Sequence, residues 1–332
     1  MEDLVSGMNW DRSRVMVTGA TGLVGSWLVR RLLELNATVV VLIRDWDPQS
    51  GLIRSGAVGR TSVVSGSLED YASLERAVNE YEVDTVLHLG AQTIVGTALR
   101  SPLPTFEANI RGTYNLLEVC RRHPDVVRVV VVASSDKAYG THRTLPYTED
   151  MALHGSQPYE VSKSCTDLLA QSYAGTYGVP IAIARCGNIY GGGDLNWSRL
   201  VPETVRALHE GRRPVLRSNG TLIRDYIYVR DVVRAYLDLA EHMVVVPSQC
   251  GEAFNFSGEQ PLTVMEMVAA IQRTMGRDDL APEIRDAAQG EILDQRLSAA
   301  KARAVLGWST HYTLDQGLAE TVAWYRSYLT GS

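Results

Sequence analysis

The feature that most constrains this chain is a glycine-rich turn near its N-terminus, set between an apolar run and an amphipathic run. Residues 14–18, Arg-Val-Met-Val-Thr, are typical of a strand, and residues 25–35 place leucines at helical spacing. Between them stands Gly-Ala-Thr-Gly-Leu-Val-Gly, residues 19–25. A strand, a glycine turn and a helix in this order predict a site for the pyrophosphate of a nicotinamide dinucleotide.

Each glycine of the turn has its own expected role. Gly19 permits the tight turn, Gly22 lets the backbone approach the pyrophosphate, and Gly25 lets the helix pack against the strand. The N–H groups at the start of the helix supply positive potential for the phosphates. The residues expected to contact the cofactor here are Gly19, Thr21, Gly22, Leu23, Val24 and Gly25.

The end of the next strand-like run, residues 38–43, bears on which dinucleotide binds. Enzymes that use NAD usually carry an acid near this point, which binds the ribose hydroxyls. Here Ile43 occupies the expected acidic position and Arg44 follows it, and an arginine suits the additional phosphate of NADP. Arg44 therefore favours NADP slightly, and a surface ion pair with Asp45 is the alternative interpretation.

Apolar strand-like runs alternate with helical runs in the first 188 residues, which is typical of a parallel sheet covered by helices. Ser67 is the expected cap of the second helix. We expect strands at residues 14–18, 38–43, 61–64, 85–89, 126–133 and 181–185, and helices at residues 25–35, 68–80, 104–122 and 159–177.

The pattern changes at the three glycines of residues 191–193. A helix is expected at residues 202–210, a hairpin at Asn219-Gly220, and an amphipathic helix at residues 314–328. We therefore predict an α/β fold in two parts. Residues 1–188 form a Rossmann-type doubly wound parallel sheet that binds the dinucleotide, and residues 189–332 form a smaller mixed α/β domain that binds the substrate.

Composition excludes several classes of protein. The net charge of −6 and the lack of a basic stripe argue against nucleic acid as a partner. No apolar run is long enough to span a membrane, and the first residues do not resemble a signal peptide, so we expect a cytoplasmic protein. The four cysteines are too widely spaced to suggest a metal site or disulfides, so reduced thiols and no metal are expected; they are Cys120, Cys165, Cys186 and Cys250.

Two short motifs predict a catalytic site at the carboxyl ends of the strands. Tyr159 and Lys163 are four residues apart and share a helix face, so the ammonium is expected to lower the pKa of the tyrosine toward neutrality. Such a tyrosine is a candidate general base for a sugar or alcohol hydroxyl. Ser135, Asp136 and Lys137 follow the valine-rich strand, and ligands bind at strand ends in open parallel sheets.

Taken together, these motifs resemble those of the extended short-chain dehydrogenase/reductases. The resemblance implies a tightly bound NAD(P) and a nucleotide-diphosphate-sugar substrate. It also implies a homodimer formed through the helices expected at residues 104–122 and 159–177. It is carried in order by the glycine turn, residues 88–92 (His-Leu-Gly-Ala-Gln), 109–113, 134–140, Tyr159-x-x-x-Lys163, residues 185–191, 224–231 and 306–308.

Within that family the chain is most similar to the CDP-glucose 4,6-dehydratases, whose hallmark resembles Ser135-Asp136-Lys137; the dTDP-glucose enzymes carry Asp-Glu at this place. The resemblance implies that Tyr159 takes the proton of the sugar's 4-hydroxyl, which Ser135 also holds, and that Lys163 holds the nicotinamide ribose. Asp136 then assists the departing 6-hydroxyl, and Lys137 takes the proton from carbon 5.

The same resemblance implies further contacts. Leu89 and Ala91 lie against the cofactor, and the substrate is bound by Gln92, Asn109, Asn188, Arg199 and Arg224. The chain departs from the CDP-glucose enzymes at residues 96–98 and 224–229, which leaves the nucleotide base and the sugar open.

Two other functions stay open. A nucleotide-sugar 4-epimerase would need Tyr159 and Lys163 but no acid and base for elimination. A non-catalytic dinucleotide-binding sensor is the more remote alternative, and the intact Ser135, Tyr159 and Lys163 argue against it.

Overall fold

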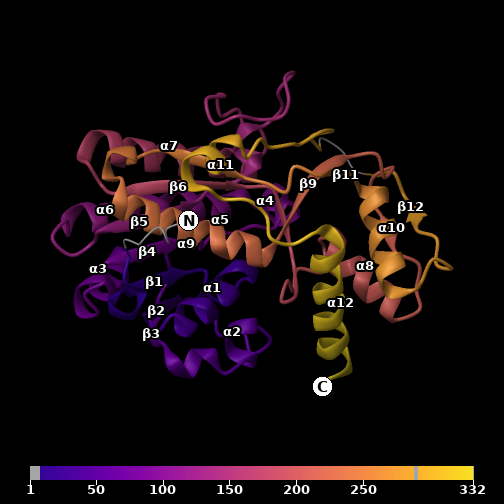
Figure 1. Ribbon diagram of the computed structural model, residues 1–332, viewed down its shortest axis with the longest axis horizontal. Coiled ribbons are helices and arrows are strands. Elements are labelled where there is room, and N and C mark those ends of the chain that lie inside the picture. The colour runs from indigo at the N-terminus through magenta and orange to yellow at the C-terminus, as the bar shows by residue number, and fades with distance from the viewer. Residues whose placement is uncertain (1–7, 288–290, 332) are drawn as a thin grey trace, which may run out of the picture.

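The computed structural model describes residues 8–287 and 291–331, and a seven-stranded parallel sheet runs through its centre (Figure 1). The strand order is β10-β6-β5-β4-β1-β2-β3. The chain order reverses between β1 and β4, the point where ligands bind in doubly wound sheets. The predicted Rossmann-type sheet is therefore confirmed. The strands are β1 Arg14–Thr18, β2 Thr38–Ile43, β3 Ser62–Ser65, β4 Thr85–His88, β5 Val129–Ala133, β6 Ile181–Cys186 and β10 Ala253–Phe256.

Helices cover both faces of this sheet, which explains why its strands are apolar throughout. In β5, Val129 and Val131 pack with the helices of one face, and Val130 and Val132 pack with those of the other. The first face is covered mainly by α1 (Leu23–Glu34) and α9 (Val229–Val245). The second is covered by α3 (Tyr71–Glu80), α6 (Gly112–Arg122) and α7 (Pro158–Tyr177).

The part of the chain after residue 189 contributes to the sheet as well as forming its own layer. Strand β10 pairs in parallel with β6, and α9 packs on the sheet. The rest makes a three-stranded sheet, β11-β9-β7, and a strand pair, β12-β8. Figure 1 shows α8, α10 and α12 grouped beside the large sheet, and a separate apolar cluster joins them.

The remaining elements are short or lie in this second layer. The strands are β7 Asn188–Tyr190, β8 Val215–Leu216, β9 Ile223–Tyr228, β11 Pro261–Thr263 and β12 Glu283–Ile284. The helices are α2 Gly51–Arg54, α4 Val95–Arg100, α5 Pro102–Phe106, α8 Leu200–His209, α10 Val264–Met275, α11 Ala300–Leu306 and α12 Leu314–Thr330.

Two local predictions were wrong. Ser67 does not cap α3; the helix starts later, and the carboxylate of Asp70 accepts from the backbone N–H groups of Ala72 and Ser73 at 3.1 and 3.3 Å. Asn219-Gly220 does form a turn, with φ +88° at Gly220, but β8 and β9 join different sheets, so it closes no hairpin.

Other boundaries moved by a few residues. The helix expected at residues 104–122 begins at Pro102 and contains a π-helical turn, Glu107–Arg111, between α5 and α6. Strand β5 begins at Val129, three residues later than expected from the valines. The π-helical turn carries Asn109 and Arg111, and such turns often mark functional sites.

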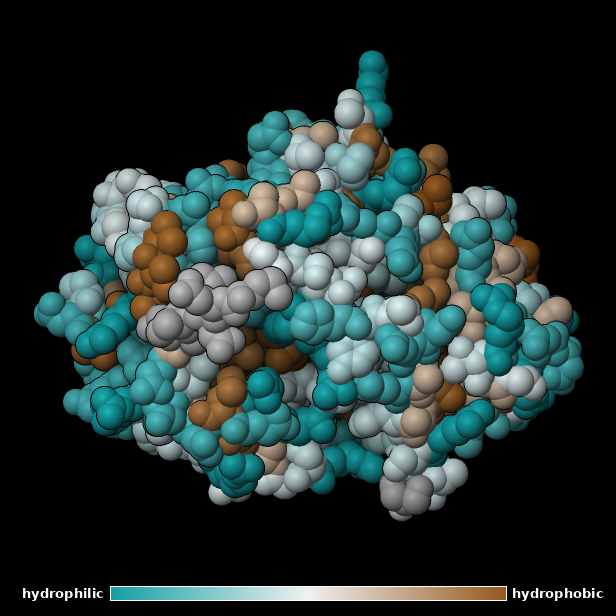
Figure 2. All heavy atoms as spheres, viewed as in Figure 1, coloured by the Kyte–Doolittle hydropathy of each residue, from teal (hydrophilic) through white to brown (hydrophobic). Residues whose placement is uncertain are grey.

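In the described ranges, no helix is long and apolar enough to cross a membrane. The face shown in Figure 2 is mostly hydrophilic, and its apolar residues form separate patches.

Candidate active site

The glycine turn lies where β1 meets α1, and its glycines leave space that other residues would fill. Gly19 has φ +70°, and a Cβ there would lie 2.8 Å from the backbone nitrogen of Gly90. A Cβ on Gly25 would lie 2.2 Å from the carbonyl oxygen of Gly19. Within residues 8–287 and 291–331, no side chain caps the start of α1 at Gly22. The first N–H groups of the helix are therefore available, and the turn fits a dinucleotide pyrophosphate.

The end of β4, which leads into Leu89 and Ala91, lies directly beside this turn. The backbone N–H of Leu89 donates to the carbonyl oxygen of Thr18 at 3.3 Å. His88 is buried between two threonines, with Nδ1 2.8 Å from Thr18 Oγ1 and Nε2 3.1 Å from Thr113 Oγ1. Burial and the nearby Lys163 lower the pKa of His88 to about 3, so this ring is neutral. His88 therefore joins β1, β4 and α6 beneath the site.

Arg44 lies at the surface beyond β2. Its Nε atom is 2.6 Å from Oδ2 of Asp45, and both side chains are mostly exposed, at 65% and 74%. The surface ion pair that the sequence left as an alternative is present.

Ser135 connects the catalytic candidates from two elements, the end of β5 and the start of α7. Its Oγ donates to Oδ1 of Asp136 at 2.9 Å and accepts from the backbone N–H of Lys137 at 3.2 Å. Burial raises the pKa of Tyr159, and the side chain of Ser135 is one of the groups that oppose this rise. The structure thus brings together four of the five predicted catalytic residues around one hydroxyl group.

The fifth residue, Lys163, does not act on Tyr159 as expected. Its Nζ donates to the backbone carbonyl of Ala133 at 2.8 Å, and burial lowers its own pKa to about 8. The expected low pKa of Tyr159 is wrong for this structure, because burial raises that pKa to about 12. The cation that opposes this rise is Arg199. Spacing along a helix indicated a shared face, but it could not indicate that the lysine side chain reaches back to β5.

Asp136 and Lys137 have the electrostatics of an acid and a base. Burial raises the pKa of Asp136, against the opposing effects of Lys137, Ser135 and Arg224. Burial lowers the pKa of Lys137, against the attraction of Asp136. Both shifts favour the uncharged forms. In the described part of the chain, Oδ2 of Asp136 is buried without a hydrogen-bond partner. An acid and a base at adjacent positions, with their pKa values shifted in these directions, suit the proton transfers of an elimination.

A residue that the sequence did not reveal contacts this pair. Nζ of Lys137 donates to Oε1 of Gln295 at 2.6 Å, and Gln295 is completely buried. The two residues are 158 positions apart, so no local pattern could have paired them.

The use of lysine in this chain is selective. Among 32 basic residues, the lysines are Lys137, Lys163 and Lys301. Lys301 pairs with Glu252 on the surface, and the other two lie in the candidate site. An ammonium in a buried place can lose its proton near neutral pH, whereas a guanidinium cannot. The two lysines at the site can therefore exchange a proton near neutral pH, which the abundant arginines cannot do.

Asn109 and Gln92, predicted to bind substrate, are bonded to each other. Asn109 Oδ1 accepts from the backbone N–H of Gln92 at 2.7 Å, and its Nδ2 donates to the Gln92 carbonyl at 3.0 Å. The same Nδ2 also donates to Ser162 Oγ on α7 at 2.9 Å. Asn109 therefore fixes the segment after β4 against α7, and Gln92 lies nearer the surface.

The two predicted arginines both lie near the reacting groups. Arg199 is paired with Asp194 at 2.9 Å and donates to Thr93 at 3.2 Å, and its charge acts on Tyr159. Arg224 is buried and its charge acts on Asp136 and Lys137.

Arg224 on β9 is held by contacts with one loop. Another residue predicted to bind substrate, Asn188, lies on the neighbouring strand β7. Arg224 donates to the carbonyl of Ile292 at 2.8 Å and to Glu291 at 2.9 Å. Asn188 begins β7, which pairs with β9, and its Nδ2 is buried without a partner among the described residues. These groups can donate to the diphosphate of a bound nucleotide.

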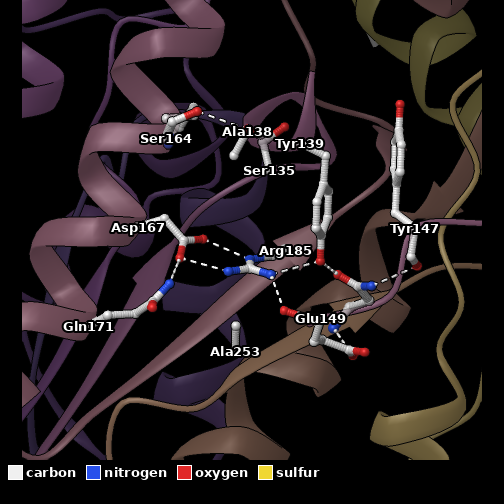
Figure 3. Close-up of polar contacts among 12 residues, drawn as sticks. Ser135, Ala138, Tyr139, Tyr147, Glu149, Ser164, Asp167, Gln171, Arg185 and Ala253 are labelled. Atoms are coloured by element: carbon white, nitrogen blue, oxygen red, sulfur yellow. Dashed lines mark hydrogen bonds and ion pairs between the residues drawn. The ribbon is translucent and has the colours of Figure 1, made fainter. Parts of the chain in front are cut away.

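A buried ion pair, shown in Figure 3, sets the position of the loop after β5. Arg185 on β6 makes two bonds to Asp167 on α7, at 2.8 and 2.9 Å. Its Nη1 also donates to the Tyr139 hydroxyl at 2.8 Å and to the carbonyl of Glu149 at 3.1 Å. Sequence comparison had marked Arg185 only as part of a motif; the structure shows that it joins β6, α7 and the loop that follows Lys137.

The described residues contain no group of three or more histidine, cysteine, aspartate or glutamate side chains that could hold a metal ion. The groups gathered at the strand ends are those of proton and hydride transfer.

Comparison with known families agrees with this geometry. The family model described as "NAD dependent epimerase/dehydratase family" matches residues 15–256. A CDP-glucose 4,6-dehydratase of Salmonella typhimurium is 28% identical over 97% of this chain and 93% of its own length. A dTDP-glucose 4,6-dehydratase of the same organism is 30% identical over 94% of this chain and 92% of its own length.

Solved structures show the same fold. DesIV, a dTDP-glucose 4,6-dehydratase from Streptomyces venezuelae with NAD and TYD bound, has a TM-score of 0.85 and 28% identity, covering 96% of this chain and 98% of that one. A UDP-glucose 4-epimerase from Thermotoga maritima, with UDP-glucose, has a TM-score of 0.85 and 27% identity, covering 95% and 99%. The overall fold therefore does not separate dehydration from epimerisation, and the side chains of the site must do so.

Proposed function

The chain belongs to the NAD dependent epimerase/dehydratase family, and we propose that it is a nucleotide-sugar 4,6-dehydratase of the CDP-glucose type that uses an NAD(P) cofactor. The observation that carries the proposal is the pair Asp136 and Lys137 beside Ser135. Burial moves the pKa of each toward its uncharged form. An epimerase has no need of such a pair, because it breaks no carbon–oxygen bond.

Oxidation at carbon 4 comes first. Tyr159 takes the proton of the 4-hydroxyl, and Ser135 hydrogen-bonds the same oxygen as it becomes a ketone. A bound NAD(P) would supply hydride transfer, from carbon 4 in this oxidation and to carbon 6 after the elimination. The residues that would hold the cofactor are the glycine turn, Leu89, Ala91 and Lys163. Burial raises the pKa of Tyr159, and the positive charge of Arg199 opposes this rise.

Elimination follows at carbons 5 and 6. The new ketone makes the proton on carbon 5 acidic, and the neutral amine of Lys137 takes it. The carboxyl of Asp136 gives its proton to the 6-hydroxyl, which leaves as water. As the hydride is added at carbon 6, the ammonium of Lys137 returns the proton to carbon 5, which completes the 4-keto-6-deoxy sugar.

Arg199, Arg224, Asn188 and Gln92 are proposed to bind the nucleotide sugar. Arginine suits the diphosphate because its donors match two phosphate oxygens at once. Arg224 is held by Glu291 and by backbone carbonyls, so its guanidinium is already oriented. CDP-glucose is the proposed substrate, since Asp136-Lys137 resembles the hallmark of the CDP-glucose enzymes.

NADP is the cofactor that Arg44 favours, and the adjacent Asp45 keeps the preference small. Asp45 occupies Nε of the guanidinium and adds a negative charge beside the position of a 2′-phosphate. The attraction of Arg44 for that phosphate is partly offset, so NAD remains a competent cofactor.

A homodimer and a cytoplasmic location complete the proposal. Large apolar side chains are exposed on the two long helices and next to them: Leu103 on α5 at 66%, Tyr114 on α6 at 39% and Leu168 on α7 at 53%. A second copy of the chain that packed its own α6 and α7 here would bury them. The four cysteines are free thiols, which suits a reducing compartment.

The test is to incubate the protein with CDP-, dTDP- and UDP-glucose, with NAD or NADP, and to measure 4-keto-6-deoxy sugar by its ultraviolet absorbance in alkali. We expect that absorbance with CDP-glucose above all. Formation of a 4-epimer without it would reject dehydration and favour the epimerase. Turnover of none of these sugars, with the cofactor still bound, would favour a sensor.

A further inference from the structure

The contact between Lys137 and Gln295 has an unusual environment. Oε1 of Gln295 accepts from Nζ of Lys137, but Nε2 of the same amide is buried without a partner in the described part of the chain. A buried amide usually satisfies both of its ends. Within the described residues, the only side-chain hydrogen bond of Gln295 is the one to Lys137, so the role of this amide is expected at that lysine.

The backbone on both sides of Gln295 is held in place by hydrogen bonds. Its N–H donates to the carbonyl of Ile223 at 3.2 Å, where β9 begins. On its C-terminal side, the carbonyl of Arg296 accepts from Tyr147 at 2.7 Å, and Leu297 donates to Asp225 at 3.1 Å. The segment is therefore fixed to the second layer of the molecule and to the loop after β5, and it presents Gln295 to Lys137.

We propose that Gln295 is the positioning residue for Lys137, which it holds at the reaction centre in both the protonated and the neutral state. This proposal rests on the proposed function only for the role of Lys137 as the base. Oε1 accepts a hydrogen bond from the ammonium. The neutral amine keeps two N–H groups, so Oε1 can accept from it without a change in the position of the amide. A carboxylate would also accept from the amine in both states, but its charge would favour the ammonium, and an aliphatic side chain could accept in neither state.

Several charges act on Lys137 together with this amide. Asp136 and the more distant Glu160 and Glu291 favour the ammonium, whereas Arg224 disfavours it. Gln295 adds no net charge to this balance, so it can orient the amine without fixing its protonation. The pKa of Lys137 is therefore expected to move in opposite directions in Gln295→Glu and Gln295→Leu.

The test measures the titration of Lys137 directly. Wild type, Gln295→Glu and Gln295→Leu are labelled with acetic anhydride over a pH series, and acetylation is quantified by mass spectrometry. The small number of lysines makes the measurement clean, and Lys301 serves as the internal reference. Gln272→Glu is the matched control. Gln272 is also buried, but it lies on α10, and its side chain donates to the carbonyl of Leu280 and not to Lys137.

Gln295→Glu should raise the midpoint for Lys137 by about one to three pH units, and Gln295→Leu should lower it. A rise of one unit leaves about tenfold less neutral amine, so kcat of Gln295→Glu near neutral pH should fall about tenfold with little change in KM. Gln272→Glu should leave the Lys137 midpoint and kcat near their wild-type values.

The outcomes separate this inference from the proposed function. If the Lys137 midpoint is the same in wild type and both Gln295 variants, the inference is wrong, even if the wild type dehydrates CDP-glucose. If the midpoint moves in opposite directions but no sugar is dehydrated, the proposed function fails and the role of Gln295 at Lys137 stands. A midpoint that moves equally in Gln272→Glu would also overturn the inference, because the effect would then be general.

Discussion

Nζ of Lys163 lies 2.8 Å from the carbonyl oxygen of Ala133, the last residue of β5. This bond ties the first turns of α7 to the strand that leads into Ser135. It therefore fixes the spacing between the two elements that supply the catalytic groups. The same lysine has a pKa lowered to about 8 by burial, so its proton is held weakly and its position is set by one backbone acceptor.

Tyr159→Phe should abolish turnover without loss of the cofactor. Removal of the phenol hydroxyl leaves no group to take the proton of the 4-hydroxyl, and kcat should fall by at least about 100-fold. Cofactor affinity, measured by calorimetry, should change little. Tyr177→Phe is the matched control, because Tyr177 is exposed at the end of α7. Turnover of Tyr159→Phe near the wild-type rate would contradict the proposed base.

Asp136→Asn should separate oxidation from elimination. The amide cannot protonate the departing 6-hydroxyl, so the sugar should stop after oxidation at carbon 4. Reduced nicotinamide should then accumulate, visible by its absorbance, and 4-keto-6-deoxy product should fall about 100-fold or more. Asp238→Asn is the control, since Asp238 is also a largely buried acid but lies on α9. Normal product formation by Asp136→Asn would remove Asp136 from the mechanism.

Arg44→Ala should weaken NADP more than NAD. A charged hydrogen bond to the 2′-phosphate contributes about 1.5–3 kcal/mol, so the Kd for NADP should rise at least about tenfold while that for NAD changes little. Arg31→Ala provides the control, because Arg31 pairs with Glu34 on α1. Equal weakening of both cofactors, in a calorimetric titration, would mean that Arg44 does not read the 2′-phosphate.

Mild acid should destabilise the protein through His88. The pKa of His88 in the folded state is about 3, below the ordinary value of 6.5. Between these two pH values the unfolded chain binds a proton at His88 and the folded chain does not. The associated stability is complete above pH 6.5 and is lost as the pH falls toward 3. From pH 7.5 to pH 5 the loss from this residue should be about 2 kcal/mol.

The check is urea unfolding of wild type and His88→Gln at both pH values. The variant should lose less stability between them than the wild type does. Asp225, with a pKa raised to about 6, changes stability in the opposite sense between about pH 4 and 6, and it is present in both proteins. Equal pH dependence of the two proteins would show that His88 is not the source.

Leu168→Glu should weaken the proposed dimer. A charge on the exposed face of α7 would be buried if that face met a second copy, and such burial is costly. Sedimentation should show a dimer for wild type and a shift to monomer for the variant. Val245→Glu is the control, because Val245 is exposed at the end of α9. A wild-type monomer would reject the dimer outright.

Local patterns predicted most of the fold because each depends on neighbours in sequence. The glycine turn, the valines of β5 and the spacing of Tyr159 and Lys163 all describe one element or one junction, and the structure has a β1–turn–α1 unit, a strand and a helix at these places. The alternation of strands and helices predicted a parallel sheet but not the order of its strands, and the seventh strand, β10, comes from the part of the chain that was expected to form the second domain.

The features that the sequence did not predict depend on distant contacts. Two hydrogen bonds form only when distant parts of the chain pack together: the one from Lys137 to Gln295 and the one from Lys163 to the carbonyl of Ala133. The pKa of Tyr159 was predicted in the wrong direction for the same reason: burial depends on the whole fold, and it outweighs the charge of one neighbour. The hairpin at Asn219-Gly220 failed because a turn residue shows where the chain bends, but not which strand pairs next.

The position of β10 has a consequence for synthesis. This edge strand of the large sheet, Ala253–Phe256, lies far along the chain from its partner β6, Ile181–Cys186. While the chain emerges from the ribosome, β6 has an open edge until residues 253–256 are also outside. An unpaired apolar edge is a place where nascent chains associate wrongly. The first half of this protein therefore cannot finish folding during translation until most of the second half has been made.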